Sequence, residues 1–372
     1  MVLFLHNRYR TTGGEERVVE DLLALVRVQL GERVELLGRD SATVGRARAA
    51  AGLLRGGLEP EDVARAVRLT GARVVHAHNL NPTLGWRALA AARAAGARVV
   101  LHLHQYRMVC AIGVCFTRGA QCTRCHGRNT LPGVRLNCRA SLPEAAAYGV
   151  SLALWQRRLA EQADAVIVPS VFARERLRAL GAPLPWERVH VLAPPVGAVA
   201  AESGAASGEY ALVVSRLAVE KGVDVAIEAC RTVSMALVIA GEGPERNALE
   251  EQVGSSDVRF VGHVDDARLT ALRAGAAIAL VPSLSAETFG LAAAEAMAAG
   301  LPVAASRVGA LPELLDEEDL VPPGDAGALA LAIGRLAGDR VAGARGLERV
   351  RALCAPDRVA ASLASIYDAA TL

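Results

Sequence analysis

Two cations and two carboxylates follow apolar, strand-like segments in the second half of the 372-residue chain. Arg216 and Lys221 come after the run YALVV, and Lys221 is the single lysine among 41 basic residues. Glu287 and Glu295 come after the run AIALV, with seven residues between them. A compact ammonium group suits a phosphate oxygen, and carboxylates accept hydrogen bonds from hydroxyl groups. We therefore expect these side chains to bind a phosphorylated, hydroxyl-rich ligand, although a lone lysine could also fall here by chance.

The segment between the two glutamates predicts the start of a helix. A helix N-terminus offers free backbone N–H groups and the positive end of the helix dipole, which together favour a phosphate. A glycine there lets the backbone approach the ligand closely. The alternative is an ordinary capped helix with two solvated acids. The residues expected to form this phosphate site are Thr288, Phe289, Gly290 and Leu291.

Short apolar runs alternate with helical segments along the whole chain. Such runs are typical of buried parallel strands, and the alternation predicts the α/β class with doubly wound sheets. A small, polar segment without periodicity, residues 197–209, predicts a linker. We expect two Rossmann-like domains that face each other across a cleft, over residues 1–196 and 210–354. A terminal helix over residues 355–372 could pack back on the first domain, and ligands should bind where strands end.

Charge is unevenly distributed between the two halves. Residues 1–196 carry 27 Arg and 15 acidic residues, a net charge of +12, whereas residues 197–372 carry a net charge of −10. A basic half favours an anionic partner, such as a phosphorylated acceptor or an anionic membrane surface. The alternative is that the two halves attract each other.

Neither a signal peptide nor a membrane span is expected. The amino-terminal apolar run is four residues long, and no stretch of 18 apolar residues occurs. The expected location is the cytoplasm, with peripheral contact at the inner membrane face through the basic first half as a further option. Abundant Ala and Arg favour a bacterial origin.

Five of the seven cysteines lie close together in residues 104–138, a Cys-rich insertion in the first domain. The pair Cys-x2-Cys is the chelating unit of many zinc sites, and a cytoplasmic chain disfavours disulfides. A structural zinc or iron–sulfur site is therefore expected, with buried free thiols as the alternative. Cys230 and Cys354 fit core positions of helices. The expected ligands are Cys110, Cys115, Cys122 and Cys125, with Cys138 as an uncertain fifth.

Histidines recur at the ends of two predicted strands of the first domain. We expect His76 and His78 to point to opposite faces of their strand, so that His78 faces the cleft and His76 packs in the core. The same pattern makes His104 the cleft residue of the next strand. Arg107 follows that strand and joins His78 and His104 as a candidate for binding the acceptor.

The segments SRLAVEKG and ETFGLAAAE together resemble the retaining, family-4 type of glycosyltransferase, which has the GT-B fold. TTGGEERVV resembles the Gly-rich loop of this family, and VVHAHNLNP, HQYRMVC, VLAPPVG, GEGP and VRFVGHV resemble further segments in the same order. The match covers most of the chain. One such segment alone would be weak, since GEGP lacks the third glycine of a dinucleotide fingerprint.

The resemblance implies a role for each site residue. Glu295 would hold the ribose of the donor and Glu287 the hydroxyls of its sugar, while Arg216 and Lys221 would bind the diphosphate. His78 would lie near the sugar and the acceptor. The catalytic set would then be Arg216, Lys221, Glu287 and His78. The glycines implied in donor binding are Gly13, Gly14 and Gly243, together with Gly290.

The expected activity is retaining transfer of a sugar from a nucleotide-diphosphate sugar, with UDP or GDP, to a glycan, lipid or small-molecule acceptor. No Asp-x-Asp motif occurs, so we expect catalysis without a metal or another cofactor. One alternative is a nucleotide-sugar epimerase, which the scarcity of acids at strand ends of the first domain disfavours. Another is a zinc-module protein that binds nucleic acid. Dispersed arginines and few aromatic residues disfavour it, so no nucleic-acid partner is expected.

Overall fold

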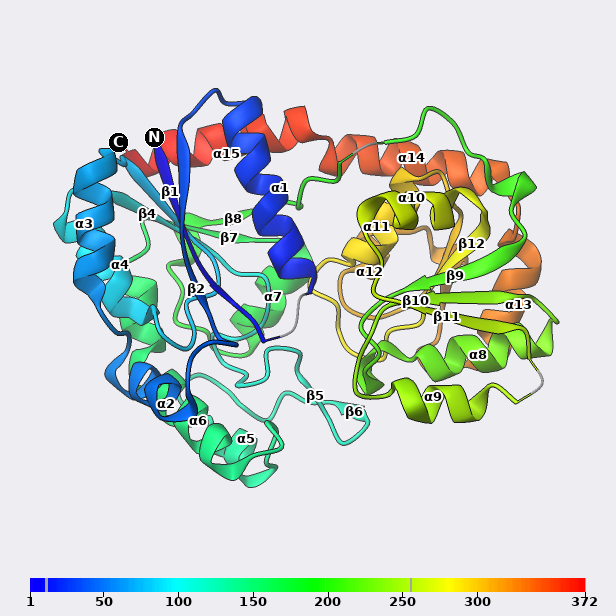
Figure 1. Cartoon of the computed structure of the whole chain (residues 1–372), viewed down its shortest axis with the longest axis horizontal. Helices are drawn as coiled ribbons and strands as arrows, with labels where there is room; N and C mark the ends of the chain where they lie inside the picture. Colours follow the sequence, from blue (N-terminus) through cyan, green and yellow to red (C-terminus); the bar gives the residue numbers. More distant parts are fainter. Residues whose placement is uncertain (11–12, 198, 255, 372) are drawn as a thin grey trace. The chain divides into compact units, whose positions relative to one another are not determined.

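The chain folds into two units, each built around a six-stranded parallel sheet (Figure 1). The computed structural model describes residues 1–10, 13–197, 199–254 and 256–371. Unit 1 comprises Met1–Cys115, Cys122–Pro195 and Pro356–Leu372, and unit 2 comprises Phe116–Gln121 and Val196–Ala355. The α/β fold with two doubly wound sheets is thus as expected.

The sheet of unit 1 is made of the predicted apolar runs and one strand that the sequence did not reveal. The missed strand is β2, whose sequence VELLGRD is half exposed because it lies at the edge of the sheet. An edge strand needs no continuous apolar run, since only one of its faces and one of its edges are covered. The strands in order across the sheet are β2 (Val34–Asp40), β1 (Val2–Arg8), β3 (Val74–Ala77), β4 (Arg98–His102), β7 (Ala165–Val168) and β8 (Val189–Val191).

Helices cover both faces of this sheet. One face packs against α3, α4 and α7, which contribute apolar residues such as Val67, Leu89 and Leu177 to the core. The terminal helix α15 packs against β4 and α1 (Figure 1). The helices of unit 1 are α1 (Gly14–Val28), α2 (Arg46–Arg55), α3 (Pro60–Thr70), α4 (Gly85–Ala94), α5 (Leu131–Arg135), α6 (Leu142–Glu161), α7 (Val171–Ala179), η1 (Trp186–Arg188) and α15 (Pro356–Thr371).

The sheet of unit 2 has the strand order of a dinucleotide-binding fold. Its first strand, β9, lies in the middle, the next two strands are added on one side and the last three on the other. The strands in order across the sheet are β11 (Val258–Gly262), β10 (Leu237–Ala240), β9 (Tyr210–Val214), β12 (Ala276–Val281), β13 (Val303–Ser306) and β14 (Leu320–Val321).

The connections of unit 2 are those of a doubly wound sheet, because a helix follows most of its strands. A short hairpin, β5 (Phe116–Thr117) and β6 (Ala120–Gln121), is grouped with this unit. The helices of unit 2 are η2 (Ala205–Ser207), η3 (Val219–Lys221), α8 (Val223–Thr232), α9 (Arg246–Gln252), α10 (Asp266–Ala274), α11 (Leu291–Ala298), α12 (Leu311–Leu314), η4 (Glu317–Asp319), α13 (Ala326–Leu336) and α14 (Arg340–Cys354).

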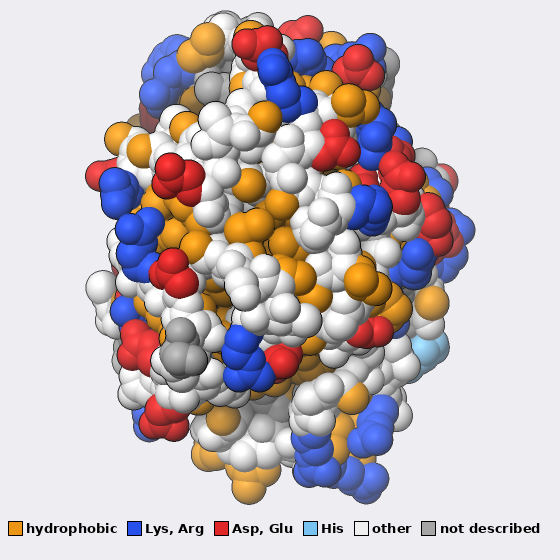
Figure 2. Space-filling model, turned by 90° about the vertical axis from the view of Figure 1, so that its right-hand side faces the viewer, with side chains coloured by type: hydrophobic (Ala, Val, Ile, Leu, Met, Phe, Trp, Pro, Cys, Tyr) orange, Lys and Arg blue, Asp and Glu red, His pale blue; other side chains and the backbone are white. Residues whose placement is uncertain are grey.

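Figure 2 shows apolar side chains gathered toward the middle of one face, with charged side chains of both signs mostly around them. Neither sign dominates this face. Within the described part of the chain, no helix is both long enough and apolar enough to cross a membrane.

Candidate active site

The loops that carry Arg216, Lys221 and Glu287 meet at the carboxyl ends of the strands in the unit 2 sheet. β9 and β12 lie side by side although the chain visits β10 and β11 between them, so their junction is where the strand order reverses. In doubly wound sheets this reversal opens a ligand site at the carboxyl ends of the strands. Lys221 follows β9 and Glu287 follows β12, which brings them to this point.

Lys221 and Glu287 form a hydrogen-bonded ion pair. Lys221 Nζ donates to Glu287 Oε1 across 2.6 Å, and Ser283 Oγ donates to the same oxygen, also across 2.6 Å. Burial alone would raise the pKa of Glu287, but the charge of Lys221 and the two hydrogen bonds bring it below its ordinary value. The ammonium group has two further N–H donors, and its side chain is 26% exposed. The pair can therefore receive an anionic ligand from solvent.

Two glycines allow the loops around this pair to pack backbone against backbone. A Cβ on Gly309 would lie 2.3 Å from the backbone nitrogen and oxygen of Glu287, and its φ of +62° is in the left-handed region. A Cβ on Gly243, which we expected in the donor site, would lie 2.1 Å from the carbonyl oxygen of Leu217. Both glycines therefore hold the site loops in place through their small size.

The second predicted glutamate lies on α11, the helix that begins after the loop of Glu287. Gly290 occupies the position before this helix with φ of +102°, which only glycine adopts readily. Glu295 is buried and forms an ion pair with Arg273 of α10. Sequence reasoning missed Arg273, because no pattern links two residues on different helices. Glu295 is thus held by a cation of its own.

Arg216 does not share the ion pair of Lys221 and Glu287. Its guanidinium pairs with Glu220 on the same loop and is half-exposed. An exposed, flexible side chain at this position remains free to turn toward a ligand. Lys221 and Arg216 therefore lie on one loop, but the structure joins only Lys221 to the buried part of the site.

The Gly-rich loop predicted in unit 1 lies between β1 and α1. Glu16 fixes this loop, because its carboxylate accepts hydrogen bonds from the backbone N–H groups of Gly13 and Tyr9, each across 3.0 Å. Gly14 is the first residue of α1. Residues 11–12, which belong to the same predicted loop, lie outside the described residues.

A cavity beyond the carboxyl ends of β3 and β4 gathers the three residues expected on the acceptor side. His78, His104 and Arg107 all line it. Trp86 and Trp155 form an apolar part of its wall. Rings of this size offer flat surfaces for a sugar or an alkyl group.

Glu15 also lines this cavity, and sequence reasoning missed it. Tyr9 donates its hydroxyl hydrogen to Glu15 Oε2 across 2.8 Å, and Gln105 Nε2 donates to the same oxygen across 3.3 Å. Burial raises the pKa of Glu15 above its ordinary value. Its place directly after two glycines was the available signal, because residues that follow a Gly-rich turn often face a ligand. Arg107, stacked 5.0 Å over the ring of Tyr9, completes this polar wall.

The expectation that His76 and His78 point to opposite faces is wrong. Side chains two residues apart in a strand share one face, and these two rings stack with centroids 4.5 Å apart. His102 and His104 stack in the same way at 4.3 Å. His76 is nevertheless in the interior, since it is fully buried, and His78 does reach the cavity.

The cysteines of the predicted insertion lie near one another without forming a compact ligand set. Cys110 and Cys115 share a hydrogen bond between their side chains. The thiol of Cys125 lies 3.9 Å from the carbonyl oxygen of Thr130. Among the residues that the structure describes, the one group with ligand atoms close enough for a metal is a histidine group. A zinc or iron–sulfur site at Cys110, Cys115, Cys122, Cys125 and Cys138 therefore stays a prediction.

The two doubly wound sheets, with cations and carboxylates at the strand reversal of one of them, define the class of GT-B glycosyltransferases. Two family models match the chain: "Glycosyl transferase 4-like domain" over residues 2–195 and "Glycosyl transferases group 1" over residues 208–339. The chain belongs to this family of glycosyltransferases.

Some known proteins share part of this sequence, and others share its fold. A GDP-mannose-dependent alpha-(1-6)-phosphatidylinositol dimannoside mannosyltransferase of Mycobacterium tuberculosis is 35% identical over 177 residues, which are 42% of this chain and 45% of that protein. The matched part thus spans less than half of that relative. A sucrose-phosphate synthase of Thermosynechococcus elongatus has the same fold, with a TM-score of 0.69, 19% identity and coverage of 99% and 98% of the two chains. HepE of Anabaena in complex with UDP also matches, with a TM-score of 0.63, 17% identity and coverage of 98% of each chain.

Proposed function

We propose that this glycosyltransferase moves a sugar from a nucleotide-diphosphate sugar to an acceptor hydroxyl with retention of configuration at the anomeric carbon. Unit 2 binds the donor, and unit 1 supplies residues for the acceptor. Family membership favours this function over the epimerase and nucleic-acid alternatives, because the matched models are those of glycosyltransferases.

The observation that carries the proposal is the ion pair of Lys221 and Glu287 at the reversal of strand order. A donor has an anionic diphosphate and a sugar with several hydroxyl donors. Lys221 offers two free N–H donors to the diphosphate, and the Glu287 carboxylate offers acceptors to the sugar hydroxyls. One site thus supplies a cation for the diphosphate and a carboxylate for the sugar hydroxyls, and these two groups are hydrogen-bonded to each other. Glu295 would hold the ribose.

The reaction breaks the bond between the anomeric carbon and the diphosphate oxygen, and negative charge then develops on the departing diphosphate. Lys221 and Arg216 stabilise this charge together with the N–H groups at the start of α11. The acceptor oxygen bonds to the anomeric carbon on the face that the diphosphate leaves. Its proton passes to an oxygen of the departing phosphate. No protein base and no metal ion is needed for this step, in keeping with the lack of an Asp-x-Asp motif.

The donor base and the acceptor are narrower proposals. UDP or GDP is the expected nucleotide, since one relative is named for GDP-mannose and one structural neighbour was solved with UDP. The cavity of unit 1 combines a guanidinium, a carboxyl group and two tryptophans. Such a wall suits an amphipathic acceptor, such as a glycan or a glycolipid. We further propose that the enzyme works in the cytoplasm, in contact with the inner membrane face when the acceptor is a lipid.

Calorimetric titration with UDP, GDP and dTDP tests the donor site. Binding of one nucleotide in the micromolar range, lost in Lys221→Ala, supports the proposal and names the base. Arg231→Ala is a matched control, because Arg231 is an exposed cation of the same unit that pairs with Glu228 on α8. A folded protein that binds none of the three nucleotides overturns the proposal. Product analysis of the linkage by NMR then tests retention, and activity in EDTA tests the metal-independent step.

A further inference from the structure

Five of the eight histidines gather on one side of the unit 1 sheet, where β1, β3 and β4 end. The sequence His-x-His spans the ends of β3 and β4, with His78 and His104 just beyond the strands, and the neighbouring parallel strands bring these pairs together. The rings stack within and between strands, and the planes of His76 and His102 are almost parallel, at an angle of 6°. His6 on β1 lies at the edge of the group, 6.3 Å from His78 between ring centroids. The proposed transfer reaction makes no use of most of these rings.

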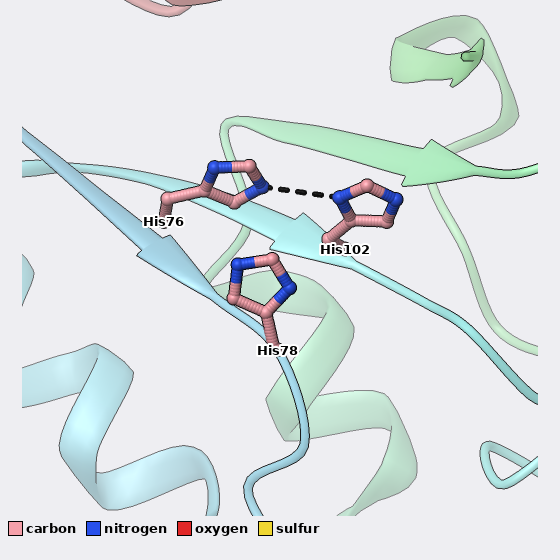
Figure 3. A group of neighbouring side chains, drawn as sticks. All are labelled: His76, His78 and His102. Carbon is pink, nitrogen blue, oxygen red and sulfur yellow. Dashed lines mark hydrogen bonds between the residues drawn. The ribbon is translucent and has the colours of Figure 1, made fainter. Parts of the chain in front are cut away.

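Three of the rings offer nitrogen atoms at the spacing of metal ligands. Ligand atoms of His76, His78 and His102 all lie within 4.8 Å of one another. His76 Nε2 and His102 Nδ1 are 3.2 Å apart. Two nitrogens bound to one tetrahedral zinc ion, with bonds of about 2.0–2.1 Å, lie about 3.3 Å apart. Figure 3 shows the third ring, His78, beside this pair.

Two of the nitrogen atoms that face away from this point have partners. Tyr367 of α15 lies 2.7 Å from His76 Nδ1, and His104 Nε2 lies 2.9 Å from His78 Nδ1. His78 Nε2 is buried and has no hydrogen-bond partner among the described residues. Outer partners of this kind fix the tautomer and orientation of a histidine that binds a metal through its other nitrogen. An ion between His76 Nε2 and His102 Nδ1 would replace the hydrogen bond that these two nitrogens share.

The three rings lie in the interior of unit 1, and each is at most 3% exposed. The rings are not sealed off, because His78 and His102 line the cavity of unit 1. The cavity gives an ion a path to the rings and leaves room for a water molecule as fourth ligand.

We propose that His76, His78 and His102 bind one divalent transition-metal ion, with zinc as the ion that three imidazoles and a water molecule suit. This site is distinct from the cysteine cluster and from the ion pair of Lys221 and Glu287, and it shares His78 with the acceptor cavity. Its structural consequence follows from Tyr367, because the ion would tie the terminal helix α15 to the central strands of unit 1 through His76.

The probe is Co²⁺, added to the full-length protein after treatment with a chelator, and Zn²⁺ is then used to displace it. Tetrahedral Co²⁺ bound by nitrogen gives visible d–d bands without the ultraviolet charge-transfer band that thiolate ligands produce. We expect these d–d bands at one ion per chain, and we expect His102→Gln to remove them. His263→Gln, which replaces an exposed histidine of unit 2, is the matched control and should retain them. A thiolate band alone assigns the ion to the cysteines and overturns the proposal.

A second pair of variants keeps the test valid if a histidine variant fails to fold. Tyr367→Phe retains the ring and removes only the hydroxyl beside His76, so the affinity for Co²⁺ should fall about 10- to 100-fold. Tyr210→Phe removes a hydroxyl that donates to the carbonyl oxygen of Leu272 in unit 2 and should leave it unchanged. Equal affinities in the two variants overturn the proposal. Nucleotide titration of the same samples reports on the donor site separately.

Discussion

At the scale of single residues, the site of unit 2 depends on one lysine in a chain that uses arginine for every other basic side chain. The structure gives that lysine a specific partner, since its ammonium group lies 2.6 Å from Glu287 Oε1. A guanidinium is wider and flat, and it would need a second acceptor in the same plane. Ser283 donates to the same carboxylate oxygen, so this oxygen has little room for a fork of two donors. The geometry thus gives a physical reason for the choice of lysine.

Replacing Lys221 by Ala should lower turnover about 100- to 1000-fold at saturating donor. The reason is that the variant loses a charge that is needed most when negative charge develops on the departing diphosphate. Steady-state kinetics with excess donor measure this effect. Arg231→Ala should keep the wild-type rate, and a Lys221→Ala enzyme with unchanged turnover would remove Lys221 from the catalytic set.

Cys110 should be the most reactive thiol of the chelator-treated protein near neutral pH. The hydrogen bond from Cys115 lowers the pKa of Cys110 to about 6, so its thiolate is present at pH 7. Burial raises the pKa of Cys354 to about 12, which makes that thiol the internal control. Peptide mapping after iodoacetamide treatment should give a half-maximal rate near pH 6 at Cys110. Cys115→Ala should move this midpoint up, and an equal midpoint in both proteins would contradict the assignment.

At the scale of elements, the sequence was most informative where burial is complete. β3 and β12 are buried along their whole length, and β4 is buried at every residue except Arg98; apolar runs predicted all three strands. β2 was missed because its sequence VELLGRD contains only a short apolar stretch among polar residues. The contacts between elements were also out of reach: nothing in the sequence links Glu295 to Arg273, or Tyr367 to His76. Periodicity describes one element at a time, whereas these pairs depend on how elements pack.

The positions of the histidines were also predicted only in part from the sequence. Their positions at strand ends indicated a site, and the cavity of unit 1 does contain His78 and His104. The expected division between an inward and an outward face failed, because the period of a strand places residues two apart on one face. Correct use of that period predicts the stack directly. The sequence therefore contains the information that places these histidines on one face of the sheet.

The loop after β12 should depend on a glycine that lies more than twenty residues further along the chain. Gly309→Ala adds a Cβ that would lie 2.3 Å from the backbone of Glu287, so this loop must shift. Gly31 has the same φ of +62° with nothing within 4 Å of its Cβ position, which makes Gly31→Ala a control for the backbone cost alone. We expect Gly31→Ala to lose about 1 kcal/mol of unfolding free energy and to bind nucleotide normally.

Denaturant titration and nucleotide calorimetry of the two variants separate these effects. Gly309→Ala should lose more stability than Gly31→Ala and should bind nucleotide at least about tenfold more weakly, since Glu287 and Lys221 would move together. Normal nucleotide affinity in Gly309→Ala would show that the loop adapts without disturbing the ion pair.

At the scale of the whole molecule, the two units differ in the groups that they bury. Unit 1 contains the five clustered histidines, whereas His263 is the one histidine of unit 2 and is exposed. Burial lowers the pKa of His76 and of His104 to about 3 in the folded state. An unfolded chain protonates these rings near pH 6.5. Below that pH the unfolded state binds more protons, so the unfolding free energy of unit 1 falls as the pH falls from about 6.5 toward 3.

The tryptophans allow this difference between the units to be measured, because Trp86, Trp155 and Trp186 all belong to unit 1. In the chelator-treated, metal-free protein, the melting temperature followed by tryptophan fluorescence should fall by at least about 5–10 °C between pH 7 and pH 4.5. Far-UV circular dichroism should then resolve a second, later transition from unit 2, in which the lowered pKa of Glu287 acts only at more acidic pH. Coincident transitions at both pH values would mean that the histidines titrate freely in the folded protein, and the buried stack would have to be abandoned.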